Sequence, residues 1–152
     1  MRIFQVFVIY LGRFFLSSIF LISSINEMLD WGETEKFVQM SMVRWVDTFQ
    51  ASDGAFMFLS ALLPWLPWFL LLGIVFKLVG SFLLIIGCNV RLGATLLIAF
   101  LVPVTWIVHG FWHIPEQNQP IEMVMFLKNI SILGGLLVVL AFGKGNASSR
   151  SD

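Results

Sequence analysis

The sequence predicts an all-α integral membrane protein, a four-helix bundle with an amphipathic interfacial helix between spans 1 and 2. Of the 152 residues, 59% are apolar and 12% are charged, whereas soluble domains average about 45–50% and about 25%. Four apolar runs are each long enough to cross a bilayer, which takes about 20 residues. Each run carries one strongly polar residue: Arg13, Lys77, His109 and Lys128.

The first run covers about residues 3–25 and is predicted to be a retained helix, because it is too long for a cleavable signal and lacks a small-residue cleavage site. The composition then becomes mixed over residues 26–62. Within this segment apolar residues recur at helical spacing, which favours an amphipathic helix on the membrane surface or across the end of the bundle. These residues are Phe37, Met40, Val43 and Val46.

The second span is predicted over residues 67–87, directly after a segment rich in proline and tryptophan. Proline suits a first helical turn, and tryptophan favours the headgroup boundary. The third and fourth spans are predicted over residues 92–112 and 121–142. All four spans form one domain over residues 1–143, and the polar tail 144–152 is predicted to be disordered.

Charge sets the orientation and excludes one class of partner. Arg2, Arg91, Lys144 and Arg150 flank one side of the predicted spans. By the positive-inside rule both termini are expected in the cytoplasm, with the protein in the inner or plasma membrane of a bacterium. The formal net charge is zero, so no basic surface for nucleic acid is expected. Cys88 is the single cysteine, which excludes an internal disulfide.

The polar residues within the runs are the candidate functional residues, because a cation near a helix centre costs at least ~2.5 kcal/mol in hydrocarbon and normally faces protein or water. Small residues share their helix faces, which favours close packing with the cations turned inward. The sequence therefore predicts a ligand-binding bundle interior, without catalytic residues or metal ligands. Its residues are Arg13, Lys77, His109, Lys128 and Glu27.

The roles of these residues stay open. The helical rise places Arg13 and Lys77 near mid-depth, where they either bond to carbonyls, hydroxyls and water or line an anion-attracting cavity. His109 is either a satisfied structural histidine or a ligand or proton relay. His113 follows one turn later, but a metal site would need a third ligand. Glu27 is either the counterion of Lys128 or a solvated acid at the helix end.

Several short segments resemble the DoxX-like family of small membrane proteins, which is related to the surfeit-locus cargo-receptor group. The similar segments are Gly12-Arg13, Leu16-Ser17, Asp30-Trp31, Lys77-Leu78-Val79-Gly80, Arg91-Leu92-Gly93-Ala94, His109-Gly110-Phe111-Trp112 and Phe126-Leu127-Lys128-Asn129. The resemblance implies a four-helix integral membrane protein. In some members it implies association with quinone-linked sulfur oxidation or oxidative-stress complexes. Glu27 and Lys77 depart from the family pattern, in which many relatives carry a base and an acid there.

Two functions of different classes remain. The first is a non-enzymatic binding or scaffold protein that holds a lipid headgroup or a partner helix, and it needs no cofactor. The lack of a nucleophile, a metal set or a cofactor loop in the sequence favours it. The alternative is a membrane subunit of a quinone-linked oxidoreductase, in which Arg13, Lys77 or His109 hydrogen-bonds a quinone and other redox subunits supply the electrons.

Overall fold

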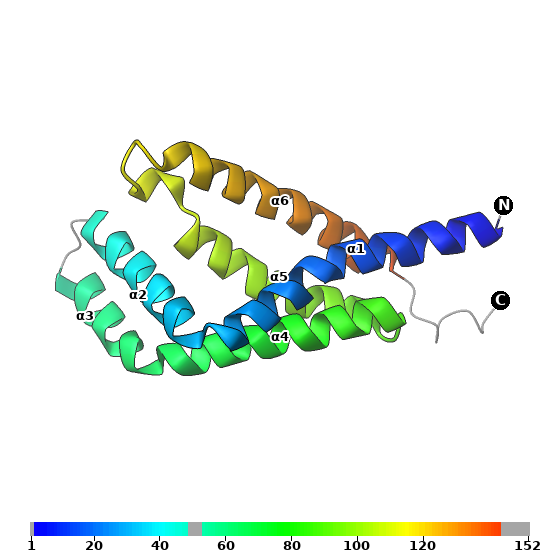
Figure 1. Cartoon of the computed structure of the whole chain (residues 1–152), viewed down its shortest axis with the longest axis horizontal. Coiled ribbons are helices and arrows are strands. Elements are labelled where there is room, and N and C mark those ends of the chain that lie inside the picture. Colours follow the sequence, from blue (N-terminus) through cyan, green and yellow to red (C-terminus); the bar gives the residue numbers. More distant parts are fainter. Residues whose placement is uncertain (1, 49–52, 144–152) are drawn as a thin grey trace.

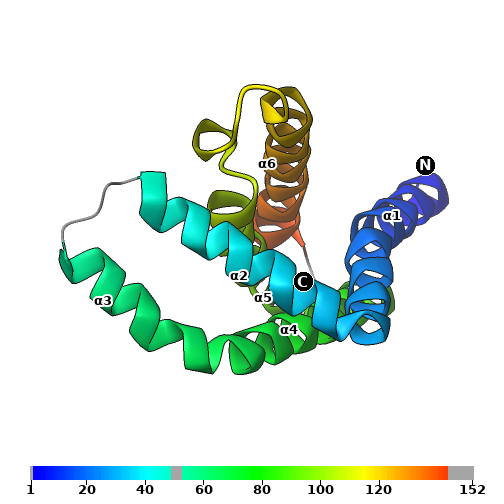
Figure 2. The same ribbon diagram turned by 60° about the vertical axis from the view of Figure 1, so that its left-hand side comes forward.

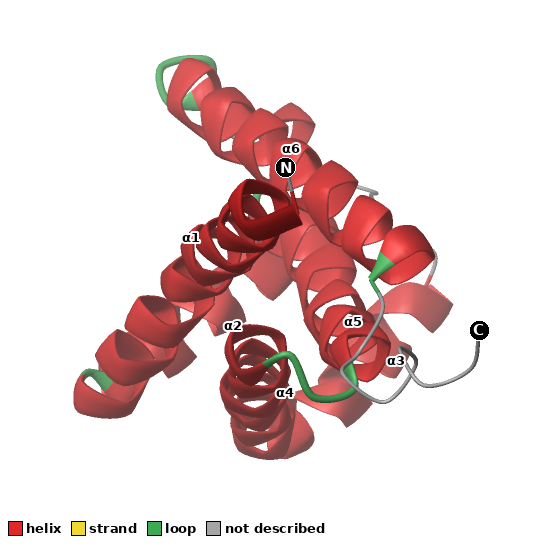
Figure 3. Cartoon of the chain, turned by 90° about the vertical axis from the view of Figure 1, so that its right-hand side faces the viewer, coloured by secondary structure: helices red, strands yellow, loops and turns green. Residues whose placement is uncertain are grey.

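A computed structural model describes residues 2–48 and 53–143 of the chain. Within this part every regular element is helical, and no strand occurs (Figure 3). The elements are α1 (Arg2–Leu29), α2 (Trp31–Thr48), α3 (Asp53–Leu62), the 3₁₀ turn η1 (Leu63–Trp65), α4 (Leu66–Ile86), α5 (Val90–Val108), the 3₁₀ turn η2 (Phe111–His113) and α6 (Gln119–Phe142). The all-α prediction is confirmed. The predicted disordered tail, 144–152, lies outside the described residues.

The helix ends follow local chemistry. Pro67 occupies the first turn of α4, where its missing N–H costs nothing. At the other end Gly87 adopts a left-handed conformation, with φ 79°, and its N–H bonds to the carbonyl of Leu83. The predicted third span runs too far, because α5 already ends at Val108 and a 3₁₀ turn follows Gly110.

The helices α4 and α5 form the centre of the molecule. In Figures 1 and 2 the helix α1 runs along α4, and α6 runs along α5. The predicted amphipathic helix is α2, which lies with α3 at the end of the molecule opposite the α4–α5 turn (Figure 1). The N-terminal end of α1 projects beyond that turn (Figure 1).

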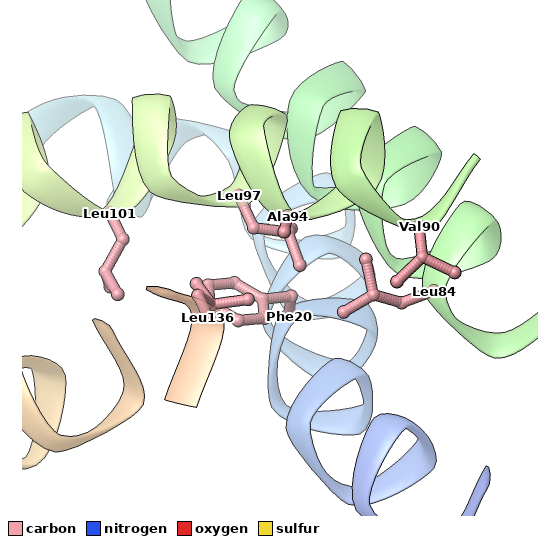
Figure 4. Packing of buried hydrophobic residues seen from close by; sticks show 7 residues of the cluster. All are labelled: Phe20, Leu84, Val90, Ala94, Leu97, Leu101 and Leu136. Carbon is pink, nitrogen blue, oxygen red and sulfur yellow. The ribbon is translucent and has the colours of Figure 1, made fainter. Parts of the chain in front are cut away.

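The apolar core gathers where the four long helices meet. In Figure 4, Phe20 of α1 and Leu136 of α6 point toward the row of α5 side chains, and Leu84 of α4 lies beside them. The α5 members are Val90, Ala94, Leu97 and Leu101. One apolar cluster therefore joins α1, α4, α5 and α6.

Two glycines bring α4 and α5 into close contact. A Cβ added to Gly80 would lie 2.9 Å from the carbonyl oxygen of Gly93, and one added to Gly93 would lie 2.8 Å from that of Gly80. These distances are too short for a Cβ atom beside a backbone oxygen, so both positions require glycine. This is the small-residue packing typical of helices in lipid.

Most apolar side chains face outward. Within the described residues, four helices are long and apolar enough to cross a membrane: Ile3–Leu29, Leu63–Ile86, Val90–Val108 and Gln119–Phe142. In the most apolar window of the α6 span, only 11% of the residues are buried by the rest of the chain. Soluble monomers rarely expose apolar patches larger than a few hundred Å², so this surface favours contact with lipid.

Candidate functional site

The interface between α1 and α4 is a polar seam inside an otherwise apolar molecule. From α1 it contains Arg13, Ser17, Ser24 and Glu27, and from α4 it contains Lys77 and Ser81; all except Glu27 are buried. These α1 residues are four, seven and three positions apart along the chain, so they share one helix face. The faces that the sequence predicts to turn inward on α1 and α4 do turn toward each other.

Lys77 and Glu27 form the centre of this seam. The Lys77 ammonium lies 2.5 Å from Oε2 of Glu27, and the side chains are 0% and 24% exposed. Ser23 links the two, because its Oγ donates to Oε1 of Glu27 at 2.9 Å and accepts from Nζ of Lys77 at 3.2 Å. Glu27 is therefore the counterion of Lys77, and neither sequence alternative for Glu27 is correct.

An aromatic ring completes the surroundings of Lys77. Its Nζ lies 4.6 Å from the centroid of the Phe100 ring on α5, within cation–π range. The ring can approach α4 because residue 73 is glycine: a Cβ there would lie 3.1 Å from two Phe100 ring carbons. Phe20 meets the same ring edge-on, with centroids 6.5 Å apart. The Lys77 ammonium thus contacts a carboxylate, a hydroxyl and a π face.

Arg13 lies at the end of the α4 helix and not at the depth of Lys77. Its Nη1 would be 3.3 Å from a Cβ placed on Gly87, and its guanidinium lies 5.8 Å from the Tyr10 ring centroid. Gly87 follows Lys77 by ten residues, which is about 15 Å along a helix. The expectation that Arg13 and Lys77 share one depth is therefore wrong. A cation at a helix C-terminus is favoured by the dipole.

Between these two cations lies a pair of buried serines. Ser81 of α4 donates from its Oγ to the backbone carbonyl of Ser17 on α1, at 3.3 Å. Ser17 Oγ is the only buried side-chain polar atom without a hydrogen-bond partner in the described part of the chain. The short Ser81 side chain thus links α4 to the backbone of α1.

His109 belongs to a second polar contact at the other end of α5. Its Nδ1 lies 2.8 Å from Oε2 of Glu122 in the first turn of α6, and each side chain is 20% exposed. An aromatic cluster lies at the same turn, with neighbouring ring centroids 5.1–5.7 Å apart: Trp106, Phe111, Trp112 and Phe126. This contact ties the start of α6 to the end of α5.

Lys128 lies on the outer surface of α6, which corrects its predicted place in the interior. The residue is exposed, and its Nζ contacts the thioether sulfur of Met125, one turn earlier on α6, at 3.3 Å. The prediction relied on spacing within α6, where Lys128, Ser131 and Gly135 recur on one face. The three residues do not share one environment. Gly135 lies next to Leu16 of α1, whereas Lys128 and Ser131 are exposed.

An open groove of about 610 Å³ runs along α2. Its described lining is apolar apart from Gln39 and Arg44, and the apolar members are Phe37, Met40 and Val43. These three side chains are exposed, whereas Ser41 on another face of α2 is buried. The described part of the predicted amphipathic stripe on α2 is therefore exposed; Val46, its fourth member, has a side chain outside the described set.

The sequence reasoning missed three partners. Ser23 and Phe100 contact Lys77, and Glu122 contacts His109. Of these three, only Glu122 could have been predicted from the sequence. It lies in the first turn of α6, and the short link after α5 brings that turn close to His109. Within residues 2–48 and 53–143 no three of the His, Cys, Asp and Glu side chains gather as metal ligands.

Comparison with known families adds one finding. Residues 5–142 match the model of a family described as HR-like lesion-inducing. The chain belongs to the HR-like lesion-inducing family. This match overturns the resemblance to the DoxX-like family, which depended on single glycines, serines and basic residues scattered over four helices. Such residues recur wherever small membrane helices pack closely. No solved structure matches this member of the HR-like lesion-inducing family.

Proposed function

We propose that this protein is an integral membrane protein in which α1, α4, α5 and α6 cross the bilayer, and that it acts as a non-enzymatic binding or scaffold protein. The buried Lys77–Glu27 pair is the observation that carries the proposal. Lys77 already has a carboxylate, a hydroxyl and a ring around its ammonium, so an incoming ligand would have to displace internal contacts. The seam therefore serves to hold α1 against α4.

Binding then takes place on the outer surface. The four long helices offer an apolar surface to lipid, and α2 offers the groove lined by Phe37, Met40 and Val43 at the membrane boundary. An amphipathic helix with an exposed apolar stripe and a basic residue, here Arg44, suits an interface with lipid headgroups. The name of the family describes an effect, lesion induction, and specifies neither a reaction nor a ligand.

We propose that both termini lie on the cytoplasmic side, because basic residues such as Arg91 flank that side of the spans and cytoplasmic flanks carry an excess of Lys and Arg. Four spans return the chain to the side on which it started. The α4–α5 turn lies at the same end as the C-terminus of α6, because Arg91 donates a hydrogen bond to the carbonyl of Ala141 at 3.3 Å. Exposed Cys88 lies in that turn and is the single cysteine, so it provides a natural probe. A membrane-impermeant maleimide should label it only from the cytoplasmic side.

One experiment separates the scaffold from the quinone-linked alternative. The protein is purified in mild detergent, and native mass spectrometry records its bound small molecules with and without added ubiquinone. The scaffold proposal predicts bound lipid and no quinone adduct. The quinone-linked alternative predicts a stoichiometric quinone adduct that is lost in Lys77→Ala and kept in Lys36→Ala. That result would refute the scaffold proposal in favour of an oxidoreductase subunit. Recovery of the protein in the soluble fraction after alkaline carbonate washing would refute the membrane placement itself.

A further inference from the structure

The outward side of α6 carries a charge without a counterion in the described part of the chain. Lys128 is exposed on a helix long and apolar enough to cross a membrane, and its described contact is a thioether, a weak acceptor. It lies nine residues after Gln119, which is about 13 Å along the helix. A cation exposed to hydrocarbon is costly, so an anionic group is expected to meet it there.

Small residues continue from Lys128 toward the middle of α6. Ser131 and Gly134 are both exposed, and a Cβ on Gly134 would meet no atom within 4 Å. We call this surface the α6 outer face and define it by Val124, Lys128, Ser131, Gly134 and Val138. Val124 and Val138 are 63% and 59% exposed. Small residues on a face let a second helix backbone approach closely in lipid.

We propose that the α6 outer face binds a transmembrane helix of another protein, and that this helix carries a carboxylate at the depth of Lys128. The inference rests on the membrane placement proposed above. A lipid headgroup could neutralise the ammonium near the boundary, but it would leave the surface around Gly134 without a function, because Gly134 lies six residues deeper, about 9 Å.

A second copy of the chain fits this face less well. Two parallel copies related by a twofold axis through this face would place Lys128 opposite Lys128, and like charges repel strongly at low dielectric. The carboxylates within the four long apolar helices of the described chain, Glu27 and Glu122, are already paired with Lys77 and His109. The chain therefore offers no spare acid at this depth in its described part, and the carboxylate must come from a different helix.

The test uses a designed probe in lipid vesicles. The probe is a single-span helix of leucine and alanine with one Asp roughly a third of the way along, labelled for energy transfer to the full-length protein. Association is expected, and Lys128→Leu should weaken it about tenfold, as should Asp→Leu in the probe. Lys128→Arg should retain it, and Gly134→Leu should weaken it by blocking approach. Lys36→Leu, an exposed lysine on α2, serves as the matched control.

A lipid headgroup or a second copy of the chain on the α6 outer face would give a different result in this experiment. If Lys128→Leu abolishes retention of phosphatidylglycerol and leaves probe association unchanged, Lys128 binds a headgroup and the proposal is refuted. If Lys128→Leu changes the oligomeric state in detergent, the face joins two copies and the proposal also fails. Carbonate extraction of each variant checks membrane insertion, so loss of the membrane placement is distinguishable from loss of the probe contact.

Discussion

Lys77 shows how a charged residue becomes stable within apolar helices. Its ammonium is fully buried, but Glu27, Ser23 and Phe100 supply a carboxylate, a hydroxyl and a ring. Burying an ion pair gives little net stability compared with apolar residues of the same shape, whereas removing one partner is strongly destabilising. The pair therefore fixes which faces of α1 and α4 meet more than it adds to the total free energy of folding.

The Glu27→Gln substitution should destabilise the protein by about 3 kcal/mol, because it leaves the charge of Lys77 buried without a counterion. The measurement is the free energy of unfolding in mixed detergent micelles. The double variant Glu27→Gln with Lys77→Met should recover a large part of the loss, since no charge is then left unpaired. Glu33→Gln breaks the exposed Lys36–Glu33 pair and should cost less than about 1 kcal/mol. Equal losses for the two glutamates would contradict the role assigned to Lys77.

Residue patterns predicted the faces of the helices better than the partners of the charges. The spacing of Arg13, Ser17 and Glu27 identifies the buried side of α1, because periodicity is a local property of one helix. It cannot identify what lies opposite, since this depends on the stagger between helices. The stagger places Glu27 at Lys77 and Arg13 at Gly87, which no pattern in either helix alone indicates.

At the scale of the elements, glycines determine how closely the helices pack. The α4–α5 crossing depends on Gly80 and Gly93, whose backbone atoms are in contact. The sequence marked Gly80 as part of an inward face, but the matching position on α5 could not be predicted without the crossing point. For the same reason, spacing alone placed Lys128 in the interior. Helix α6 is apolar around most of its circumference, so its inward side is poorly defined by the pattern.

The Gly93→Ala substitution should destabilise the α4–α5 pair. The new Cβ would lie 2.8 Å from the carbonyl oxygen of Gly80 and 2.5 Å from Cδ1 of Leu84, and the backbone oxygen cannot move aside. Overpacking of this kind costs about 1–3 kcal/mol. Thermal unfolding in detergent measures the effect. Gly12→Ala is the matched control, because a Cβ there meets nothing within 4 Å and alanine favours helix by about 1 kcal/mol. A stability gain at residue 93 would disprove the tight crossing.

At the scale of the whole molecule, α1 and α6 are attached to the central α4–α5 hairpin along one side each, and their remaining surface is apolar and exposed. Composition and run length were sufficient to predict four long apolar helices and an amphipathic one. They were not sufficient to identify the family, because the residues used for that comparison are general features of closely packed helices. What holds α1 in place is its polar face, which lies against α4.

Disulfide cross-linking tests this claim most directly. In a Cys88→Ser background, cysteines replace Ser17 and Ser81; in the natural protein the Ser81 hydroxyl lies 3.3 Å from the backbone carbonyl of Ser17 across the seam. A second pair replaces Phe14, which is 50% exposed on another face of α1, and Ser81. Under mild oxidation in membranes, the 17–81 pair should form an intramolecular disulfide and the 14–81 pair should not. Cross-linking of the 14–81 pair alone would mean that α1 presents a different face to α4, and the account given for Lys77 and Glu27 would be wrong.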